Sequence, residues 1–370
     1  ACGVQLGTRF LAADECSVHR NYKDKVLKAN DLATVTTGKR LGHPIRSLKS
    51  PFTRTLLDAE YSGISNKELE EMGAGRVALA AREGDLQNGC FLAGQIAGMV
   101  NREQPAAEIG YTLFQHNSAA RALFDEIDRL RPGTSNLCFF GTEEALGETQ
   151  NTQPCLFACE LAAARALQSA GVRPDMAAGF SLGEIAALTI AGSVSLASGF
   201  ELVTRRGELM QADAQKAAGA MVAVIKLDAG TVDALCREFD RAYPVNYNCP
   251  GQTGVACLKS ELPAFADAVR AAGGRAIPLK VGAGFHSPFF REASRGFALA
   301  LQQHLIAPPA IPLYSNYTGL PYEKDYALLL SRQICNPVRW ETIVQNMIAE
   351  GADTFFEAGP GRVLSGMIKK

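Results

Sequence analysis

The chain carries no excess of charge of either sign and no long hydrophobic run. Its 370 residues include 37 lysines and arginines and 38 aspartates and glutamates, for a net charge of −1. Without a positive surplus, nothing attracts the chain to nucleic acid or to an anionic membrane. No apolar run reaches the ~18 residues that a bilayer span requires. Neither nucleic acid nor a membrane is therefore predicted as a partner.

Paired cysteines are also absent. The ten cysteines are scattered singly, and none forms a C-x-x-C pair, so the sequence predicts no metal site. No secretory signal is recognisable either. Isolated cysteines in such a chain are typical of reduced thiols in a cytoplasmic protein, many of them buried as small apolar side chains.

Two parts of the chain, residues 1–109 and 110–370, differ in pattern. The first part has a short apolar strand, GVQLG, then a basic, loop-rich stretch. Its helices are predicted at NKELEEMGAG, RVALAAREG and FLAGQIAGMVNRE. The second part alternates strands and helices, which is typical of an α/β sheet that binds its ligand at the carboxyl ends of the strands. Its main helices are predicted at SAARALFDEIDRL, NTQPCLFACELAAARALQSAG, EIAALTIAG and LASGFELVTRRGELMQADAQ.

An insert at about residues 219–282 interrupts this alternation. It reads as a strand, a helix, two strands around a Pro-Gly turn, a second helix and a last strand. The order β-α-β-β-α-β is that of a ferredoxin-like subdomain.

Ser181 is the first candidate for catalysis. It lies in AGFSLGEIAAL, where Gly179 and Gly183 flank it as small residues flank the serine of a nucleophile elbow. In an elbow, the Leu182 N–H would face a developing oxyanion at the start of the following helix. A glycine-flanked turn that happens to hold a serine would show the same pattern.

A serine nucleophile needs a base, and the chain has only five histidines. His19 and His43 lie in the basic first part, His116 follows the boundary, and His304 ends a predicted helix. His286 lies in KVGAGFHSPFF, a glycine-rich turn between a strand and a helix. Local sequence supports a base and a structural histidine equally at that position.

Seven ordered motifs extend the pattern: NTQPCLF, AGFSLGEIAALTIAG, RRGELMQ, NYNCPGQTGVA, GFHSP, QICNPVRW and FFEAGPGRVLSGMI. From about residue 113 to the end, the chain resembles the malonyl-CoA:acyl carrier protein transacylases. The resemblance implies an α/β-hydrolase-like parallel sheet core that contains the inserted subdomain. It implies that Ser181 takes the malonyl group from malonyl-CoA as an ester, while His286 acts as base and then acid. Acyl carrier protein would receive the group, and no cofactor would be needed.

The same resemblance assigns roles to further residues. The backbone carbonyl of Gln333 would orient the histidine, and Arg206 would hold the malonyl carboxylate. The neighbouring Arg205 is the alternative and is expected to face solvent. Arginine suits that role because its planar fork forms two parallel hydrogen bonds with a carboxylate. Gln153 and Asn248 match polar positions that line the cleft, and Phe285 matches a bulky residue associated with malonyl over methylmalonyl.

One family feature is missing. The family begins with a strand that ends in an F-P-G-Q-G loop, whose glutamine amide is the second oxyanion donor. No such segment precedes GYTLFQHNSAARALF, and the only PGQ, Pro250–Gln252, belongs to the insert. The sequence therefore also allows a catalytically impaired remnant of the family.

Residues 1–109 resemble a different family. GVQLGTRFLAADECSVHRNYK, HPIRSLKS and MGAGRVALAAREGD resemble the C-terminal part of flavin-dependent enoyl-acyl carrier protein reductases, which belong with the nitronate monooxygenases. The resemblance implies a partial TIM-barrel fragment, in which the amides of Gly7 and Thr8 would hold the FMN phosphate. Most of the barrel is absent, so the protein is expected to be colourless, without bound FMN. The alternative function is an FMN-dependent enoyl-acyl carrier protein reductase or nitronate monooxygenase activity of this first part.

Overall fold

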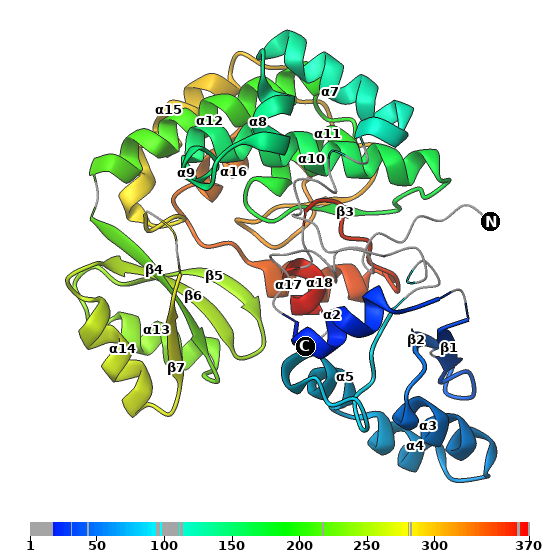
Figure 1. The fold of residues 1–370 in the computed structure, drawn as a ribbon. Helices are drawn as coiled ribbons and strands as arrows, with labels where there is room; N and C mark the ends of the chain where they lie inside the picture. Colours follow the sequence, from blue (N-terminus) through cyan, green and yellow to red (C-terminus); the bar gives the residue numbers. More distant parts are fainter. Residues whose placement is uncertain are drawn as a thin grey trace. The chain divides into compact units, whose positions relative to one another are not determined.

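The computed structural model describes residues 18–30, 32–42, 44–93, 97, 111, 114–216, 218–279, 281, 283–360 and 363–368. The chain divides into two compact units, Ala1–Thr112 and Leu113–Lys370 (Figure 1). None of the helices in the described part of the chain combines the length and the apolar composition that a membrane span requires.

The first unit is built from short helices and one antiparallel pair of strands. The strands β1 (Thr34–Thr37) and β2 (Ile45–Leu48) pair with Thr34 opposite Leu48. Ser50 and Ser65 cap the two helices that follow, each through a reciprocal capping box. The helical elements are α2 (Arg20–Leu27), α3 (Pro51–Tyr61), α4 (Asn66–Gly73), α5 (Arg76–Ala78) and the π-helical turn η1 (Leu79–Glu83).

Two predictions for the first unit need correction. The stretch expected to be basic and loop-rich contains α2, both strands and α3, because Tyr22 and Val26 lie one helical turn apart and are buried together. The helix predicted from Phe91 does not begin there. Residues 91–93 are extended against β2, where the Leu48 amide donates to the Phe91 carbonyl at 2.7 Å.

Two further helix predictions for this unit are confirmed, and two other predicted elements lie wholly or partly outside the described residues. The helix predicted at NKELEEMGAG is α4, and the one predicted at RVALAAREG is α5 with η1. The predicted strand GVQLG, and with it Gly7 and Thr8, lies outside the described residues. Residues 94–103 of the helix predicted at FLAGQIAGMVNRE also lie outside them, except Ala97.

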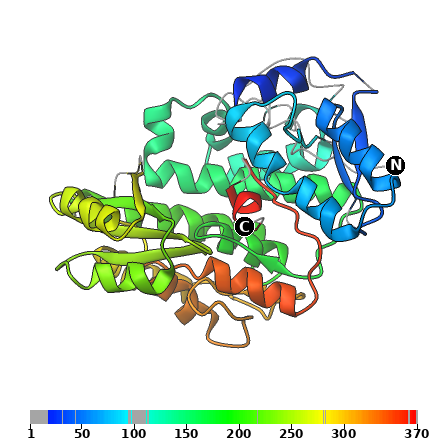
Figure 2. The same ribbon diagram turned by 90° about the horizontal axis from the view of Figure 1, so that it is seen from below.

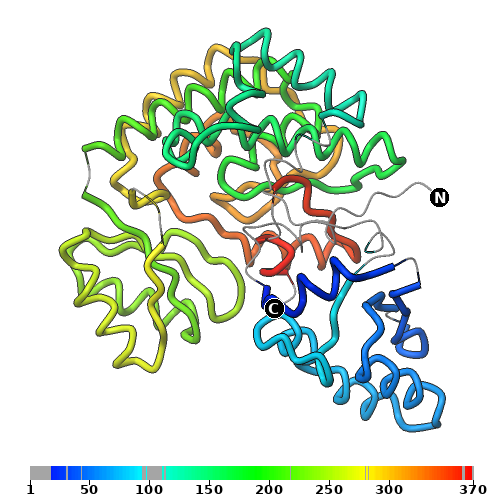
Figure 3. The backbone as a smooth tube through the Cα atoms, in the orientation of Figure 1, coloured from blue at the N-terminus to red at the C-terminus, as the bar shows by residue number. Residues whose placement is uncertain are grey.

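Helices make up most of the second unit. The four predicted at its amphipathic segments are present as α7, α10, α11 and α12; α10 begins before Asn151 and carries Pro154 inside it. Helix α12 packs against both α10 and α15 (Figures 1 and 3). The helices are α7 (Ser118–Leu130), α8 (Thr134–Phe140), α9 (Glu143–Gly147), α10 (Thr149–Ser169), α11 (Gly183–Ile190), α12 (Leu196–Lys216), the 3-10 turn η3 (Pro288–Phe290), α15 (Arg291–Leu301), α16 (Tyr326–Gln333), α17 (Trp340–Ala349) and α18 (Val363–Ile368).

The parallel sheet is small in the described residues. Strands β3 (Ala177–Ala178) and β8 (Leu313–Tyr314) pair in parallel, with Ala177 opposite Leu313. Leu313 and Tyr314 are fully buried, as strands of a parallel sheet usually are. The turn that holds Ser181 follows β3 directly, at the carboxyl end of the strand.

The insert is a separate lobe of the second unit, with the predicted element order (Figures 1 and 2). Its four-stranded antiparallel sheet has the order β5-β6-β4-β7, and apolar side chains of α13 and α14 cover one face. Gly219 and Gly284, where the chain enters and leaves the lobe, lie so close that a Cβ atom on Gly219 would meet the Gly284 nitrogen at 2.7 Å. The elements are β4 (Gly219–Ile225), α13 (Ala229–Cys236), β5 (Tyr243–Cys249), β6 (Gln252–Leu258), α14 (Leu262–Ala271) and β7 (Arg275–Pro278).

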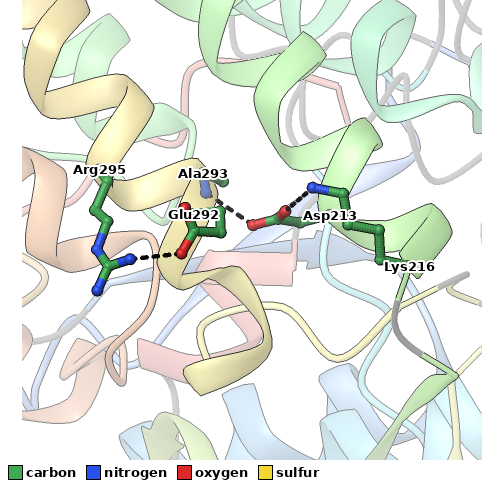
Figure 4. A network of polar contacts seen from close by, with 5 residues as sticks. All are labelled: Asp213, Lys216, Glu292, Ala293 and Arg295. Atoms are coloured by element: carbon green, nitrogen blue, oxygen red, sulfur yellow. Dashed lines mark hydrogen bonds and ion pairs between the residues drawn. The ribbon is translucent and has the colours of Figure 1, made fainter.

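A buried carboxylate joins the helices on either side of the insert (Figure 4). Asp213, in the last turn of α12, accepts a hydrogen bond of 2.7 Å from the Ala293 amide in the first turn of α15. Its other oxygen contacts Lys216 at 3.2 Å. A carboxylate is favourable at the start of a helix because the first amides have no partner within the helix. The contact therefore holds together the helix before the insert and the helix after it.

Candidate active site

A sharp turn between β3 and α11 presents Ser181. Ser181 has a positive φ of 56°, which is rare for a residue with a side chain. Gly179 makes the turn possible, since a Cβ atom there would lie 1.8 Å from the Gly183 carbonyl oxygen. The side chain of Asn316, which follows β8, supports the turn: it accepts from the Ser181 amide and donates to the Gly179 carbonyl, both at 2.6 Å.

The second candidate, His286, lies against the serine. His286 Nε2 is 2.7 Å from Ser181 Oγ, and Nδ1 is 2.8 Å from the Gln333 carbonyl oxygen. A carbonyl only accepts, so Nδ1 carries the proton and Nε2 is free to accept one from the hydroxyl. Gln333 is the last residue of α16, where helix carbonyls lack partners within the helix. The negative end of that helix also favours an imidazolium when one forms.

The environment keeps His286 neutral. Burial, and then the positive charge of Arg206, lower the pKa of His286 to about 3, although the bond to the Gln333 carbonyl opposes this shift. A neutral imidazole in contact with a hydroxyl is the form that a general base requires.

Arg206 lies in α12 with 1% of its surface exposed. It donates to Gln153 Oε1 and Gln333 Oε1, each at 2.8 Å, and to Ser181 Oγ at 3.2 Å. Burial lowers the pKa of Arg206 to about 10, and the charge of Glu184 opposes that shift, so the guanidinium remains positive at neutral pH. All three acceptors are neutral, so the cation keeps its capacity to bind an anionic group.

Glu184 was not singled out in the sequence, yet it is central to the site. It is fully buried and accepts hydrogen bonds from the Asn316 amide, the Tyr322 hydroxyl and Gln333 Nε2. Burial raises the pKa of Glu184 to about 7, and these three donors and Arg206 act against that shift. A signal was present: Glu184 is the only charged residue in the apolar segment GEIAALTIAG, and buried charges are usually paired.

The remaining predicted residues differ in their surroundings. Gln153 contacts Arg206 as described, whereas Arg205 is exposed and pairs with Glu208. Phe285 packs with Met221, Val245 and Ala256 on the sheet face of the insert opposite α13 and α14. Asn248 is buried in β5, and Leu182 precedes α11 as its N-cap.

The only PGQ of the sequence is a turn of the insert. Pro250 and Gly251 connect β5 with β6, and Gln252 is the first residue of β6. This segment is therefore a hairpin turn rather than a loop after a central parallel strand. The described residues also hold no group of three or more His, Cys, Asp or Glu side chains able to bind a metal ion.

Comparison with known families identifies the larger part of the chain. Residues 104–370 match the family model for the acyl transferase domain. The chain belongs to the acyl transferase family. Residues 1–116 match the model for nitronate monooxygenase, and this match shares residues 104–116 with the acyl transferase match.

Individual relatives support this family assignment. The malonyl CoA-acyl carrier protein transacylase of Bacillus subtilis is 35% identical over 270 residues, which cover 71% of this chain and 85% of the relative. The Escherichia coli protein of the same name is 36% identical over 237 residues, covering 62% and 77%.

Solved structures show the same similarity. The Clostridium perfringens malonyl CoA-acyl carrier protein transacylase has a TM-score of 0.68 at 31% identity, covering 70% of this chain and 84% of that one. A malonyl-transacylase solved with a type II polyketide acyl-carrier protein has a TM-score of 0.66 at 34% identity, covering 70% and 86%. The acyl transferase thus shares its α/β fold with these enzymes.

Proposed function

We propose that the second unit transfers the malonyl group of malonyl-CoA to acyl carrier protein in fatty acid biosynthesis. The observation that carries the proposal is the arrangement around the hydroxyl oxygen of Ser181. The neutral base His286 lies 2.7 Å from this oxygen, and the buried cation Arg206 lies 3.2 Å from it. The relatives named as malonyl CoA-acyl carrier protein transacylases support the same reaction.

The first half-reaction forms an ester on Ser181. His286 Nε2 takes the hydroxyl proton as Ser181 Oγ attacks the thioester carbonyl, which gives a tetrahedral oxyanion. We propose the Leu182 N–H as a donor to that oxyanion, at the positive end of α11. The carbon–sulfur bond then breaks, and the imidazolium returns its proton to the departing CoA thiolate.

The second half-reaction reverses these roles. The thiol of the carrier protein's phosphopantetheine arm gives its proton to His286 and attacks the Ser181 ester. Collapse of the second tetrahedral species releases Ser181, which regains the proton from His286. The order is therefore ping-pong, with the acyl group held on the serine between partners.

Arg206 supplies the preference for malonyl. A malonyl group has a free carboxylate where acetyl has only a methyl hydrogen. The guanidinium is held by neutral amide oxygens of Gln153 and Gln333, which fix its direction without neutralising its charge. A fixed, charged fork binds a carboxylate in two parallel hydrogen bonds. We propose Asn248 and Phe285 as further cleft residues, Phe285 disfavouring a branched methylmalonyl group.

The missing F-P-G-Q-G segment sets an expected limit on the rate. Loss of one oxyanion donor lowers kcat by roughly 10²–10³-fold in other acyl-transfer enzymes. We therefore expect slow turnover, with Ser181 acylation remaining detectable because the nucleophile, base and cation are all present.

Intact mass measurement tests the reaction. Incubation with malonyl-CoA should add one malonyl group to the native chain and none to the Ser181→Ala variant. Subsequent addition of phosphopantetheinylated carrier protein should remove the adduct and load the carrier. The absence of any adduct on native protein, or an adduct that persists in Ser181→Ala, would contradict the proposal.

The match to nitronate monooxygenase raises a second candidate, an FMN-dependent activity of residues 1–116. We propose that this part is a fragment of such a barrel and does not retain FMN. The described residues of the first unit contain an antiparallel pair of strands and helices, whereas a barrel holds FMN at the top of parallel strands. A visible flavin spectrum at one FMN per chain would show the opposite.

We propose three finer assignments as well. The parallel core is α/β-hydrolase-like, and the insert, with its β5-β6-β4-β7 order, is a ferredoxin-like subdomain. The free cysteines among the described residues are consistent with a cytoplasmic location.

A further inference from the structure

We propose that Glu184 is a positioning residue, which fixes the side-chain amide of Gln333 in the single orientation that serves both Arg206 and Ser181. The inference rests on the proposed malonyl transfer and adds a residue to its machinery.

The contacts of Glu184 leave little freedom. One oxygen accepts from the Asn316 amide at 2.9 Å and from the Tyr322 hydroxyl at 2.6 Å. The other accepts from Gln333 Nε2 at 2.9 Å. All these groups are buried, so no contact can be exchanged for one with bulk water.

The direction of the Gln333 amide follows from hydrogen-bond chemistry. One oxygen of Glu184 is occupied by the Asn316 amide and the Tyr322 hydroxyl, and the other accepts from Gln333 Nε2, so it is the NH₂ end of Gln333 that faces Glu184. Its oxygen then faces Arg206, which donates to it at 2.8 Å. The same NH₂ group also donates to the Ser181 carbonyl at 2.6 Å. A reversed amide would set donor against donor at Arg206 and acceptor against acceptor at Glu184.

Gln333 thereby connects three parts of the site. Its backbone carbonyl holds the His286 ring, and its side chain holds both the Arg206 guanidinium and the backbone of the serine turn. Glu184 touches none of the reacting atoms. It acts through Gln333, and through its negative charge it also favours the ionised form of Arg206.

Glu184→Gln tests this role, with Tyr322→Phe as the matched control. Each variant keeps the side-chain shape and alters hydrogen bonding at the same carboxylate. Only Glu184→Gln introduces a donor there, so only that variant allows the Gln333 amide to turn around.

The first readout is the rate of Ser181 acylation from malonyl-CoA and from acetyl-CoA. In Glu184→Gln, the malonyl rate should fall about tenfold further than the acetyl rate, because a misdirected Gln333 displaces the cation that only malonyl uses. In Tyr322→Phe, both rates should change by the same factor. An unchanged malonyl-to-acetyl ratio in Glu184→Gln would overturn the proposal.

A crystal structure of Glu184→Gln decides the question independently of turnover. If the Arg206–Gln333 contact of 2.8 Å is lost, Glu184 is the positioning residue. If Arg206 keeps that contact, the proposal is wrong. Failure of the unsubstituted protein to form a malonyl ester would instead contradict the proposed function, and the structural readout would still test Glu184.

Discussion

Arg206 and His286 share one contact atom, the hydroxyl oxygen of Ser181. Arg206 Nη2 lies 3.2 Å from Ser181 Oγ, and His286 Nε2 lies 2.7 Å from it. In the proposed reaction the cation would stabilise negative charge on the oxygen as the base removes its proton, and burial together with the charge of Arg206 keeps that base unprotonated beforehand. When a substrate carboxylate binds, the guanidinium gains a stronger acceptor than the neutral oxygens it contacts in the free enzyme.

Replacement of Arg206 by alanine should damage malonyl transfer far more than acetyl transfer. Loss of a buried charge pair costs about 2–5 kcal/mol, so the malonyl preference should fall roughly 30-fold or more. Arg206→Lys should recover only part of it, because an ammonium lacks the planar fork. Rates of Ser181 acylation from both thioesters give the ratio.

The neighbouring Arg205 provides the control for that experiment. It is exposed and pairs with Glu208 on the helix surface, so Arg205→Ala should leave both rates near those of the native chain. Equal losses of malonyl and acetyl transfer in Arg206→Ala would mean that this arginine only supports the fold.

The two glycines of the serine turn should respond differently to alanine. A Cβ atom on Gly179 would lie 1.8 Å from a backbone oxygen, whereas one on Gly183 would come no closer than 3.7 Å to its nearest neighbour, Glu160. Gly179→Ala should destabilise the protein by on the order of 3 kcal/mol or more. Gly183→Ala should cost under about 1 kcal/mol. Urea unfolding of both variants measures this, and equal losses would contradict the geometry of the turn.

Glu160 should make stability depend on pH. Burial raises the pKa of Glu160 to about 8 from 4.5, and its Oε2 has no hydrogen-bond partner among the described residues. The unfolded chain ionises this group above its ordinary pKa while the folded protein keeps it protonated, so its contribution to stability falls as pH rises toward 8. Glu160→Gln should therefore stabilise the protein little at pH 5 and by up to about 4 kcal/mol at pH 8.

Urea unfolding of native protein and Glu160→Gln at both pH values gives that difference. The exposed Glu238 serves as the matched control, since Glu238→Gln removes the same charge from the surface. A gain for Glu160→Gln that is the same at pH 5 and pH 8 would show that the raised pKa of Glu160 is not the cause.

Asp213 should contribute more to the stability of the fold than the Glu292–Arg295 ion pair, which Figure 4 shows beside it. Asp213→Ala leaves the buried Ala293 amide without a partner and should cost about 1–3 kcal/mol in unfolding free energy. Glu292 and Arg295 pair on the surface, with 65% and 73% of their side chains exposed, so Glu292→Gln should cost under about 1 kcal/mol. Comparable losses in the two variants would mean that Asp213 does not hold α12 to α15.

Much of this site could be predicted because its signals are local or belong to recognisable motifs. Gly179 and Gly183 indicate a tight turn, and His286 is the single histidine that lies in a glycine-rich connection between a strand and a helix. The supporting residues could not be predicted in that way. Glu184 and Asn316 are 132 positions apart, and each has an ordinary local context. Their importance arises only when folding buries them together.

The fold shows the same division. Helices with a regular apolar stripe, such as α7 and α12, were predicted at their positions, because the stripe is a property of the segment itself. The sequence predicts the start of α10 two residues too late, because Pro154 lies within the helix and not in its first turn. Residues 91–93 follow the edge of β2, a long-range pairing that periodicity does not report.

The close approach of Gly219 and Gly284 has a consequence for how the insert evolves. The chain leaves the main lobe and returns to it at nearly one point, so the lobe between them closes a loop whose ends already meet. The entropy cost of such a closure grows only slowly with the number of residues inside it. Residues can therefore be gained or lost in the insert with little penalty to the rest of the second unit, provided that β5 is unchanged, because its backbone is hydrogen-bonded to Val338 outside the insert. The two connections at Gly219 and Gly284 are the constrained part, because a side chain at position 219 would push them apart.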